Sequence, residues 1–162
     1  MGYNPDIISI SEKDISIPTE PDDNYCYPKL SSIIEKSVDP NHTLGPGTWA
    51  TLVRHKQHHA ESGNGFGYGL IPWPIAEDTI TRTISARYHK DGAEVLIEQK
   101  SKRPRRLTVK EAQQLQGFDK DRFIFPVSDT QAYRQIGNSV AIPAVEATAK
   151  EMAKILTRSK AE

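Results

Sequence analysis

Apolar residues recur at helical spacing in two stretches of the chain. The first stretch begins at Thr48, whose side chain can cap a helix, and continues to about His59. One face of this stretch follows the i, i+3, i+4, i+7 pattern, through Trp49, Leu52, Val53 and Lys56. The second stretch starts at Pro143, runs to about residue 157, and carries on one side Val145, Ala149, Met152 and Leu156. We predict a helix for each stretch.

Between these helices the pattern changes to the one typical of β-strands. Residues 79–89 are mostly β-branched or aromatic, and residues 94–98 resume this character. The intervening Lys90-Asp91-Gly92 has the chemistry of a tight turn. We therefore predict a β-hairpin from residue 79 to residue 98.

A glycine-rich stretch, residues 62–70, precedes this hairpin and cannot be regular structure, because alternate glycines weaken both helices and strands. A dinucleotide-binding fingerprint needs a strand before it and a helix after it, whereas here a helix is predicted before it. We predict a loop whose bare backbone approaches a large, flat partner, with Phe66 and Tyr68 available for contacts. A merely flexible connector is the alternative.

Three further helical segments are short. Residues 30–34 form an apolar turn that Asp39-Pro40 ends. Thr108 and Glu111 have the spacing of a capping box for a helix that ends at Gly117. Residues 128–136 read as another helix, closed by Gly137. The fold class is therefore α+β, without internal repeats.

The segment that opens the chain has a different composition. Residues 1–28 combine four prolines with Asp, Asn and Ser, so we expect an extended or loosely structured arm. We divide the chain into an acidic linker or docking arm (1–43), a recognition region (44–102) and a closing segment with the C-terminal helix (103–162). Each division follows a change in composition or predicted structure.

Composition limits the classes of protein that are possible. The 162 residues are 36% hydrophobic with a mean hydropathy of −0.58, and no apolar run approaches the ~20 residues that span a bilayer. We expect a soluble, cytoplasmic protein. The single cysteine, Cys26, permits no intrachain disulfide, which is typical of a reducing compartment.

Formal net charge is zero, but the charge is unevenly distributed. The first forty residues are acidic through Asp6, Glu12, Asp14, Glu20, Asp22, Asp23, Glu35 and Asp39. Residues 82–110 are basic through Arg82, Arg87, Lys90, Lys100, Lys102, Arg103, Arg105, Arg106 and Lys110. Such a basic stretch indicates either a phosphate-binding surface or a solvated charged face.

Other candidate chemistry is weak. His55, His58 and His59 lie close in sequence, but no acidic or cysteine partner has the spacing of a metal site, so we predict no metal and favour surface or phosphate contacts. Cys26 lacks a basic neighbour in sequence that would activate a thiolate. The residues alone thus indicate a small α+β domain that binds nucleic acid.

Two motifs extend this interpretation through resemblance. The sequences RRLTVKEA (105–112) and LQGF (115–118) resemble the ninth block of DNA cytosine-5 methyltransferases, and YRQIGNSV (133–140) with Ile142-Pro143 resembles the tenth. Upstream, residues 59–69 and 82–92 are similar to the target-recognition region of bacterial enzymes that modify CCWGG or CCGG sites. The resemblance covers about residues 44–156.

The resemblance implies roles for particular residues. It places at the DNA Asn64, Phe66, Tyr68, Arg82, Thr83, Ser85, Arg87, Tyr88 and Lys90. It assigns part of an S-adenosylmethionine pocket to Asn138, Ser139 and Val140. Structural roles fall to Arg106, Thr108, Glu111, Gly117 and Gly137. Two positions depart from the family pattern: Ile84 stands where a leucine follows the threonine, and Gln114 stands where arginine is usual.

The family reaction flips a cytosine, adds a cysteine thiolate to ring carbon 6 and methylates carbon 5. It needs a Pro-Cys-Gln loop, a Glu-Asn-Val segment and a glycine-rich cofactor motif, none of which occurs in this sequence. We therefore predict no catalytic residue, and expect the C-terminal helix to pack on a Rossmann-like methyltransferase domain. Double-stranded DNA and a catalytic polypeptide are the expected partners, at the nucleoid of a bacterium.

Three hypotheses remain open for the role of the chain. It is the recognition subunit of a split methyltransferase, an inactive truncated fragment, or a stand-alone DNA-binding module. Zero net charge weighs against strong autonomous binding, because phosphate contacts supply much of the affinity for DNA.

Overall fold

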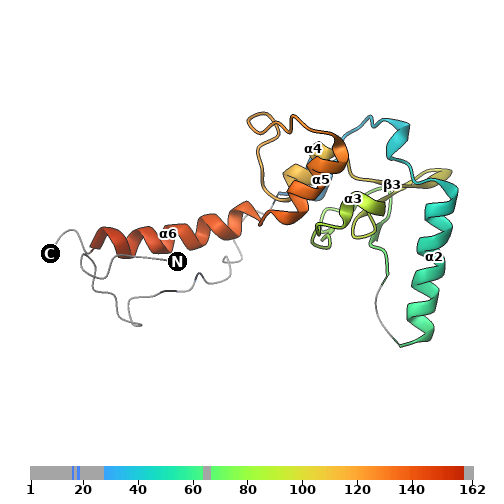
Figure 1. Ribbon diagram of the computed structural model, residues 1–162, viewed down its shortest axis with the longest axis horizontal. Helices are drawn as coiled ribbons and strands as arrows, with labels where there is room; N and C mark the ends of the chain where they lie inside the picture. Colours follow the sequence, from blue (N-terminus) through green and yellow to red (C-terminus); the bar gives the residue numbers. More distant parts are fainter. Residues whose placement is uncertain (1–15, 17, 19–27, 64–66, 159–162) are drawn as a thin grey trace. The chain divides into compact units, whose positions relative to one another are not determined.

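The computed structural model describes residues 16, 18, 28–63 and 67–158. It divides into two compact units, residues 27–140 and residues 1–26 with 141–162. The first unit contains nine elements (Figure 1), namely α1 (Leu30–Ile33), η2 (Pro40–His42), α2 (Pro46–Glu61), β1 (Leu70–Ile71), α3 (Tyr88–Asp91), β2 (Leu96–Gln99), β3 (Lys102–Arg106), α4 (Val109–Leu115) and α5 (Asp129–Asn138). The described part of the second unit contains α6 (Ile142–Arg158).

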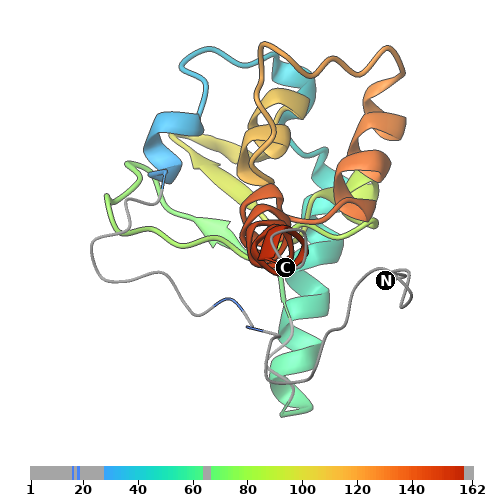
Figure 2. The same cartoon turned by 90° about the vertical axis from the view of Figure 1, so that its left-hand side faces the viewer.

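A three-stranded sheet in the order β1-β2-β3 organises the larger unit. β1 pairs with β2 in parallel, with Leu70 opposite Leu96, and β2 pairs with β3 antiparallel, with Gln99 opposite Lys102. Helix α5 lies beside both α3 and α4 in both views of the chain (Figures 1 and 2). The fold is thus mixed α+β with a small sheet, as predicted.

The predicted hairpin of residues 79–98 is wrong. Residues 79–87 form no strand, and Lys90-Asp91-Gly92 ends helix α3 instead of turning a hairpin. Gly92 has a φ of +68°, which suits a helix C-cap as well as a tight turn, so the local sequence does not distinguish them. The hairpin of this fold is β2–β3, with Lys100 and Ser101 at its turn.

The helices agree more closely with their patterns. The Thr108 hydroxyl accepts a hydrogen bond from the Glu111 N–H (3.1 Å), and the Glu111 carboxylate accepts one from the Thr108 N–H (2.8 Å), which is the predicted capping box. Helix α6 also matches its prediction. Helix α2 begins earlier than expected, because Gly45 is the N-cap and Pro46 occupies the first turn.

Two expectations about chain segments need correction. Gly137 lies inside α5 and does not close it, because α5 continues to Asn138 with Ser139 as its C-cap. Residues 30–43, expected in a loosely structured arm, belong to the larger unit, where Leu30 is buried. Most of the remaining arm, including residues 1–15 and 19–27, lies outside the described residues.

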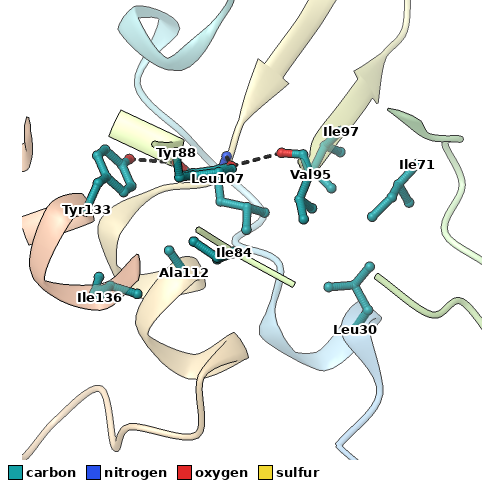
Figure 3. Packing of buried hydrophobic residues seen from close by; sticks show 10 residues of the cluster. All are labelled: Leu30, Ile71, Ile84, Tyr88, Val95, Ile97, Leu107, Ala112, Tyr133 and Ile136. Carbon is teal, nitrogen blue, oxygen red and sulfur yellow. Dashed lines mark hydrogen bonds between the residues drawn. The ribbon is translucent and has the colours of Figure 1, made fainter. Parts of the chain in front are cut away.

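The core of the larger unit lies between the sheet and the short helices (Figure 3). It consists of Leu30, Ile71, Ile84, Tyr88, Val95, Ile97, Leu107, Ala112, Tyr133 and Ile136. Each fully buried side chain of the size of leucine or isoleucine contributes about 1.5–3 kcal/mol through burial alone. Because these residues come from positions 30 to 136, the core joins the recognition region to the closing motifs.

Candidate nucleic-acid interface

The segment that resembles the recognition motif, residues 82–87, is an irregular stretch attached to the core by one side chain. Ile84 is only 3% exposed and belongs to the main hydrophobic cluster. Its neighbours Thr83 and Ser85 are exposed, as are Arg82 and Arg87. A buried anchor between exposed polar residues presents this segment to a partner in one fixed orientation.

Hydrogen bonds hold the same segment at both ends. The Arg82 guanidinium donates to the Gly67 carbonyl, and the Ser85 hydroxyl donates to the Glu94 carboxylate. The Arg87 N–H donates to the Ser85 oxygen (3.2 Å). The structure therefore brings the end of the glycine-rich loop next to the recognition segment, as the DNA-binding prediction requires.

Tyr68, predicted to contact DNA, is half-buried at the base of the glycine-rich loop. Its ring packs against Trp49, with centroids 4.9 Å apart, and the Lys56 ammonium lies 4.6 Å from the ring centroid. These contacts leave Tyr68 a smaller surface for DNA than the sequence suggested. The two neighbouring candidates, Asn64 and Phe66, lie outside the described residues.

The bare backbone of Gly69 is used within the protein. A Cβ at this position would lie 2.1 Å from the Glu94 carbonyl oxygen. The Gly69 N–H donates to Ala93 (2.8 Å), and its carbonyl accepts from Leu96 (2.7 Å), which starts the β1–β2 pairing. The close approach of the Gly69 backbone to Glu94 thus allows the strands to pair, and it requires a residue without a side chain.

Tyr88 is the one predicted DNA contact that the structure contradicts. Its side chain is fully buried, and its hydroxyl donates to the Val95 carbonyl (2.8 Å) while accepting from the Leu107 N–H (2.8 Å). Tyr133 lies edge-on to it at 5.5 Å and donates to the Leu107 carbonyl (2.6 Å). Burial raises the pKa of both tyrosines well above the usual range. Both therefore act as neutral core residues.

A buried polar cluster connects the ninth-block segment to the region after α1. The Arg105 guanidinium makes two hydrogen bonds to the Glu111 carboxylate, of 2.7 and 2.9 Å, and neither side chain is more than 7% exposed. Glu111 also accepts from the Glu35 N–H (2.8 Å), and the Thr108 hydroxyl donates to the Glu35 carboxylate (2.7 Å). The cluster satisfies its charges internally, as buried ion pairs require.

The structure gives this role to Arg105, which the sequence analysis did not select. Arg106, the predicted structural residue, is half-buried with its guanidinium carbon 5.1 Å from the Tyr133 ring centroid. Arg105 is paired with Ile97 in the sheet and is only 6% exposed. No signal in the sequence separates two adjacent arginines whose orientation depends on strand pairing.

The tenth-block residues lie where α5 ends. Asn138 and Val140 are exposed, Val140 by 63%, and the Ser139 hydroxyl hydrogen-bonds to the Ile136 carbonyl. One residue earlier, Gly137 meets the recognition segment, because a Cβ there would lie 2.2 Å from the Ser85 carbonyl oxygen. Gly137, which directly precedes the candidate cofactor segment, therefore packs closely against the backbone of the candidate DNA segment.

His42 is the titratable group most affected by the polar cluster. Burial lowers its pKa, and the neighbouring Arg106 and Arg105 charges lower it further. Its Nδ1 is buried without a hydrogen-bond partner among the described residues. The neutral imidazole is thus the form that the fold favours.

A comparison with a protein-family model identifies the family that the motifs indicate. The model of the C-5 cytosine-specific DNA methylase matches residues 2–154. The chain belongs to this family. Members of this family use S-adenosylmethionine in general, and the family implies DNA as the substrate.

Relatives of this chain include type II methyltransferases of restriction-modification systems. The chain is 51% identical to M.SsoII of Shigella sonnei over 128 residues, which are 79% of this chain and 33% of that enzyme. It is 46% identical to M1.ScrFI of Lactococcus lactis subsp. cremoris over 132 residues, which are 82% of this chain and 33% of that enzyme. It is 33% identical to M.HpaII of Haemophilus parainfluenzae over 159 residues, with 80% of this chain and 41% of that enzyme covered. The chain spans about a third of the length of the first two relatives and matches their C-terminal part.

Solved methyltransferase structures share the fold. Dnmt2 of S. pombe aligns with a TM-score of 0.62 at 13% identity, over 83% of this chain and 44% of that structure. Dnmt2 of Spodoptera frugiperda aligns with a TM-score of 0.58 at 20% identity, over 86% and 45%. Within the described residues, no helix is both long and apolar enough to cross a membrane.

Proposed function

We propose that this chain supplies target recognition, and one wall of the cofactor pocket, to a cytosine-5 methyltransferase that modifies double-stranded DNA. The observation that carries this proposal is the contact of Gly137 with the Ser85 backbone, which joins both functions in one packed unit. The chain spans about a third of the length of its first two relatives, so most of their sequence has no counterpart in it. The catalytic cysteine and the rest of the cofactor site then belong to a second polypeptide.

Among the exposed candidates, Arg87 is the best placed to read a base. Arg82 already donates to the Gly67 carbonyl, so its guanidinium is partly committed within the protein. The Arg87 side chain is exposed, and among the described residues its guanidinium has no hydrogen-bond partner. An arginine can donate two hydrogen bonds to guanine O6 and N7, worth about 1–3 kcal/mol of discrimination. We propose that the DNA backbone next to this base is contacted by Thr83, Ser85 and Lys90.

The end of α5 suits one wall of an S-adenosylmethionine pocket. Asn138 offers an amide, and the exposed Val140 offers an apolar surface. This combination fits a ligand with polar and apolar parts. When bound, S-adenosylmethionine supplies the methyl group. The residues of this segment contribute binding and orientation.

Helix α6 is the proposed contact with the Rossmann-like domain. Its apolar side chains remain accessible, Val145 by 48%, Ile142 by 38% and Leu156 by 38%. A helix that exposes an apolar side along its length is typical of a surface that a partner covers. The partner implied by the proposal is the catalytic domain of the same enzyme.

The test is methyl transfer from labelled S-adenosylmethionine to duplexes that carry CCWGG or CCGG sites. We would assay this chain alone, the remaining N-terminal portion of M.SsoII alone, and their mixture, together with any methyltransferase-like protein encoded next to this one. Activity in a mixture alone supports the proposal. Activity of this chain by itself would contradict it, since the chain would then contain the catalytic apparatus.

The other outcomes distinguish the remaining hypotheses. A mixture without activity, combined with sequence-selective DNA binding by the chain, would favour a stand-alone binding module. Absence of both would favour an inactive fragment. An Arg87→Gln variant tests the residue assignment within an active mixture, with Lys110→Gln as a control that removes an exposed charge elsewhere.

A further inference from the structure

The β2–β3 hairpin carries a group of cations that the recognition segment does not use. Lys100, Lys102 and Arg103 are exposed and follow each other closely around the turn. None of the salt bridges seen among the described residues involves any of them. The nearest acidic residue in sequence, Glu98, accepts a hydrogen bond from the Trp73 N–H (3.0 Å).

The turn is held in a defined conformation. The Gln99 amide donates to the Thr43 hydroxyl (3.0 Å) and to the Arg103 carbonyl (2.7 Å), which closes the hairpin and ties it to the segment before α2. Arg103 Nε donates to the Leu44 carbonyl (2.7 Å). Ser101 occupies the left-handed region at a φ of 59°. The backbone that carries the lysines is therefore already ordered, which lowers the conformational entropy lost when a ligand binds.

The shape of the surface supports an external ligand. Residues 101–103 line two hollows, one of about 470 Å³ toward Trp49 and Leu70, and one of about 410 Å³ toward Pro40 and Thr43. A basic turn that borders two open hollows is suited to a convex polyanion. It offers no enclosed site for a small molecule.

The sheet relates this turn to the recognition segment. Gly69 and Glu94 meet at the start of β2, whereas Ser101 follows its end. Ser101 lies five residues after Leu96 along this strand and its turn, a span of at most roughly 17 Å. This distance is about half of a B-DNA turn, whose length is about 34 Å. One duplex can therefore reach both places.

We propose that the β2–β3 turn, through Lys100 and Lys102, binds the phosphate backbone of duplex DNA beside the recognised site. This inference rests on the proposed function for the presence of DNA, and adds a contact that carries no sequence information. Each phosphate neutralised on B-DNA contributes about 0.9 to the slope of log affinity against log salt concentration. Two lysines thus account for about 1.8 of that slope.

The experiment compares the full chain with its Lys100→Gln/Lys102→Gln variant by fluorescence anisotropy between 50 and 200 mM salt. Two labelled duplexes of equal length are used, one with a CCWGG site and one with a scrambled site. The variant should lose about 1.8 of the slope, so that the fourfold rise in salt weakens it about 12-fold less than the unmodified chain. The loss should be equal on both duplexes. Lys120→Gln/Arg122→Gln removes two exposed charges outside the basic stretch of residues 82–110 and should leave the slope unchanged.

The outcomes separate the inference from the proposed function. In one outcome the chain binds the CCWGG duplex more tightly than the scrambled one, while the Lys100→Gln/Lys102→Gln variant keeps the same salt slope. That result would overturn this inference and leave the proposed function standing. Equal binding of both duplexes, with a slope that depends on the two lysines, would support the inference and count against target recognition. A similar loss in the control variant would also overturn it, because the effect would then reflect total charge. Absence of DNA binding at 50 mM salt would overturn both.

Discussion

Gly137 and Ser85 touch through their backbones, so closely that a Cβ on Gly137 would lie 2.2 Å from the Ser85 carbonyl oxygen. This contact places the last turn of α5 against the recognition segment, one residue before the proposed cofactor wall. Any side chain at position 137 must displace one segment or the other. The spacing between the proposed DNA-reading residues and the proposed cofactor wall thus depends on the absence of a side chain at position 137.

Gly137→Ala should destabilise the chain by about 1–3 kcal/mol, because the added methyl group overlaps backbone atoms that cannot rotate away. Urea unfolding of the full chain measures this change. Gly47→Ala is the matched control, since a Cβ at Gly47 meets nothing within 4 Å. Equal stability of the two variants would show that the Gly137 contact is less close than described.

Glu111→Gln should cost about 3–5 kcal/mol, because it leaves the Arg105 guanidinium buried beside a neutral amide. The free energy of unfolding, again from urea denaturation, is the quantity to compare. Glu146→Gln provides the control: its ion pair with Lys150 is exposed, and little change is expected there. A small effect at position 111 would mean that solvent reaches the cluster.

Tyr88→Phe should lower stability by about 1–3 kcal/mol while leaving DNA affinity unchanged under conditions where the variant is folded. The substitution removes one hydroxyl and leaves the Leu107 N–H and the Val95 carbonyl without that partner in the core. Thermal unfolding and anisotropy with the CCWGG duplex measure the two effects. A loss of affinity without a loss of stability would restore Tyr88 as a DNA contact.

His42 should make stability depend on pH in the mildly acidic range. Its folded pKa lies below the unfolded value of about 6.5, so the unfolded chain binds the proton more readily. Its contribution is complete above pH 6.5 and is lost as the pH falls from there through the lower folded pKa. His42→Gln should flatten that part of the curve of unfolding free energy against pH. An unchanged curve would assign the pH dependence to other groups.

The sequence by itself determined the features that depend on near neighbours. The capping box of Thr108 and Glu111 and the extent of α6 follow from residues three to four positions apart, whose interactions form within one helix. The ninth and tenth blocks identified the family in the same way, since each is a continuous stretch. Such signals need no knowledge of distant contacts.

Tertiary structure decided the rest. Residues 79–87 have strand-like composition, but β2, the strand with which the predicted hairpin would pair them, already has β1 on one edge and β3 on the other. The sequence predicted Tyr88 as an exposed recognition residue. In the structure its hydroxyl instead accepts a hydrogen bond from the N–H of Leu107, nineteen positions later. The choice of Arg105 over Arg106 and the need for glycine at position 137 likewise depend on contacts between distant segments. Periodicity and composition describe each segment alone, whereas burial and close approach are properties of two segments together.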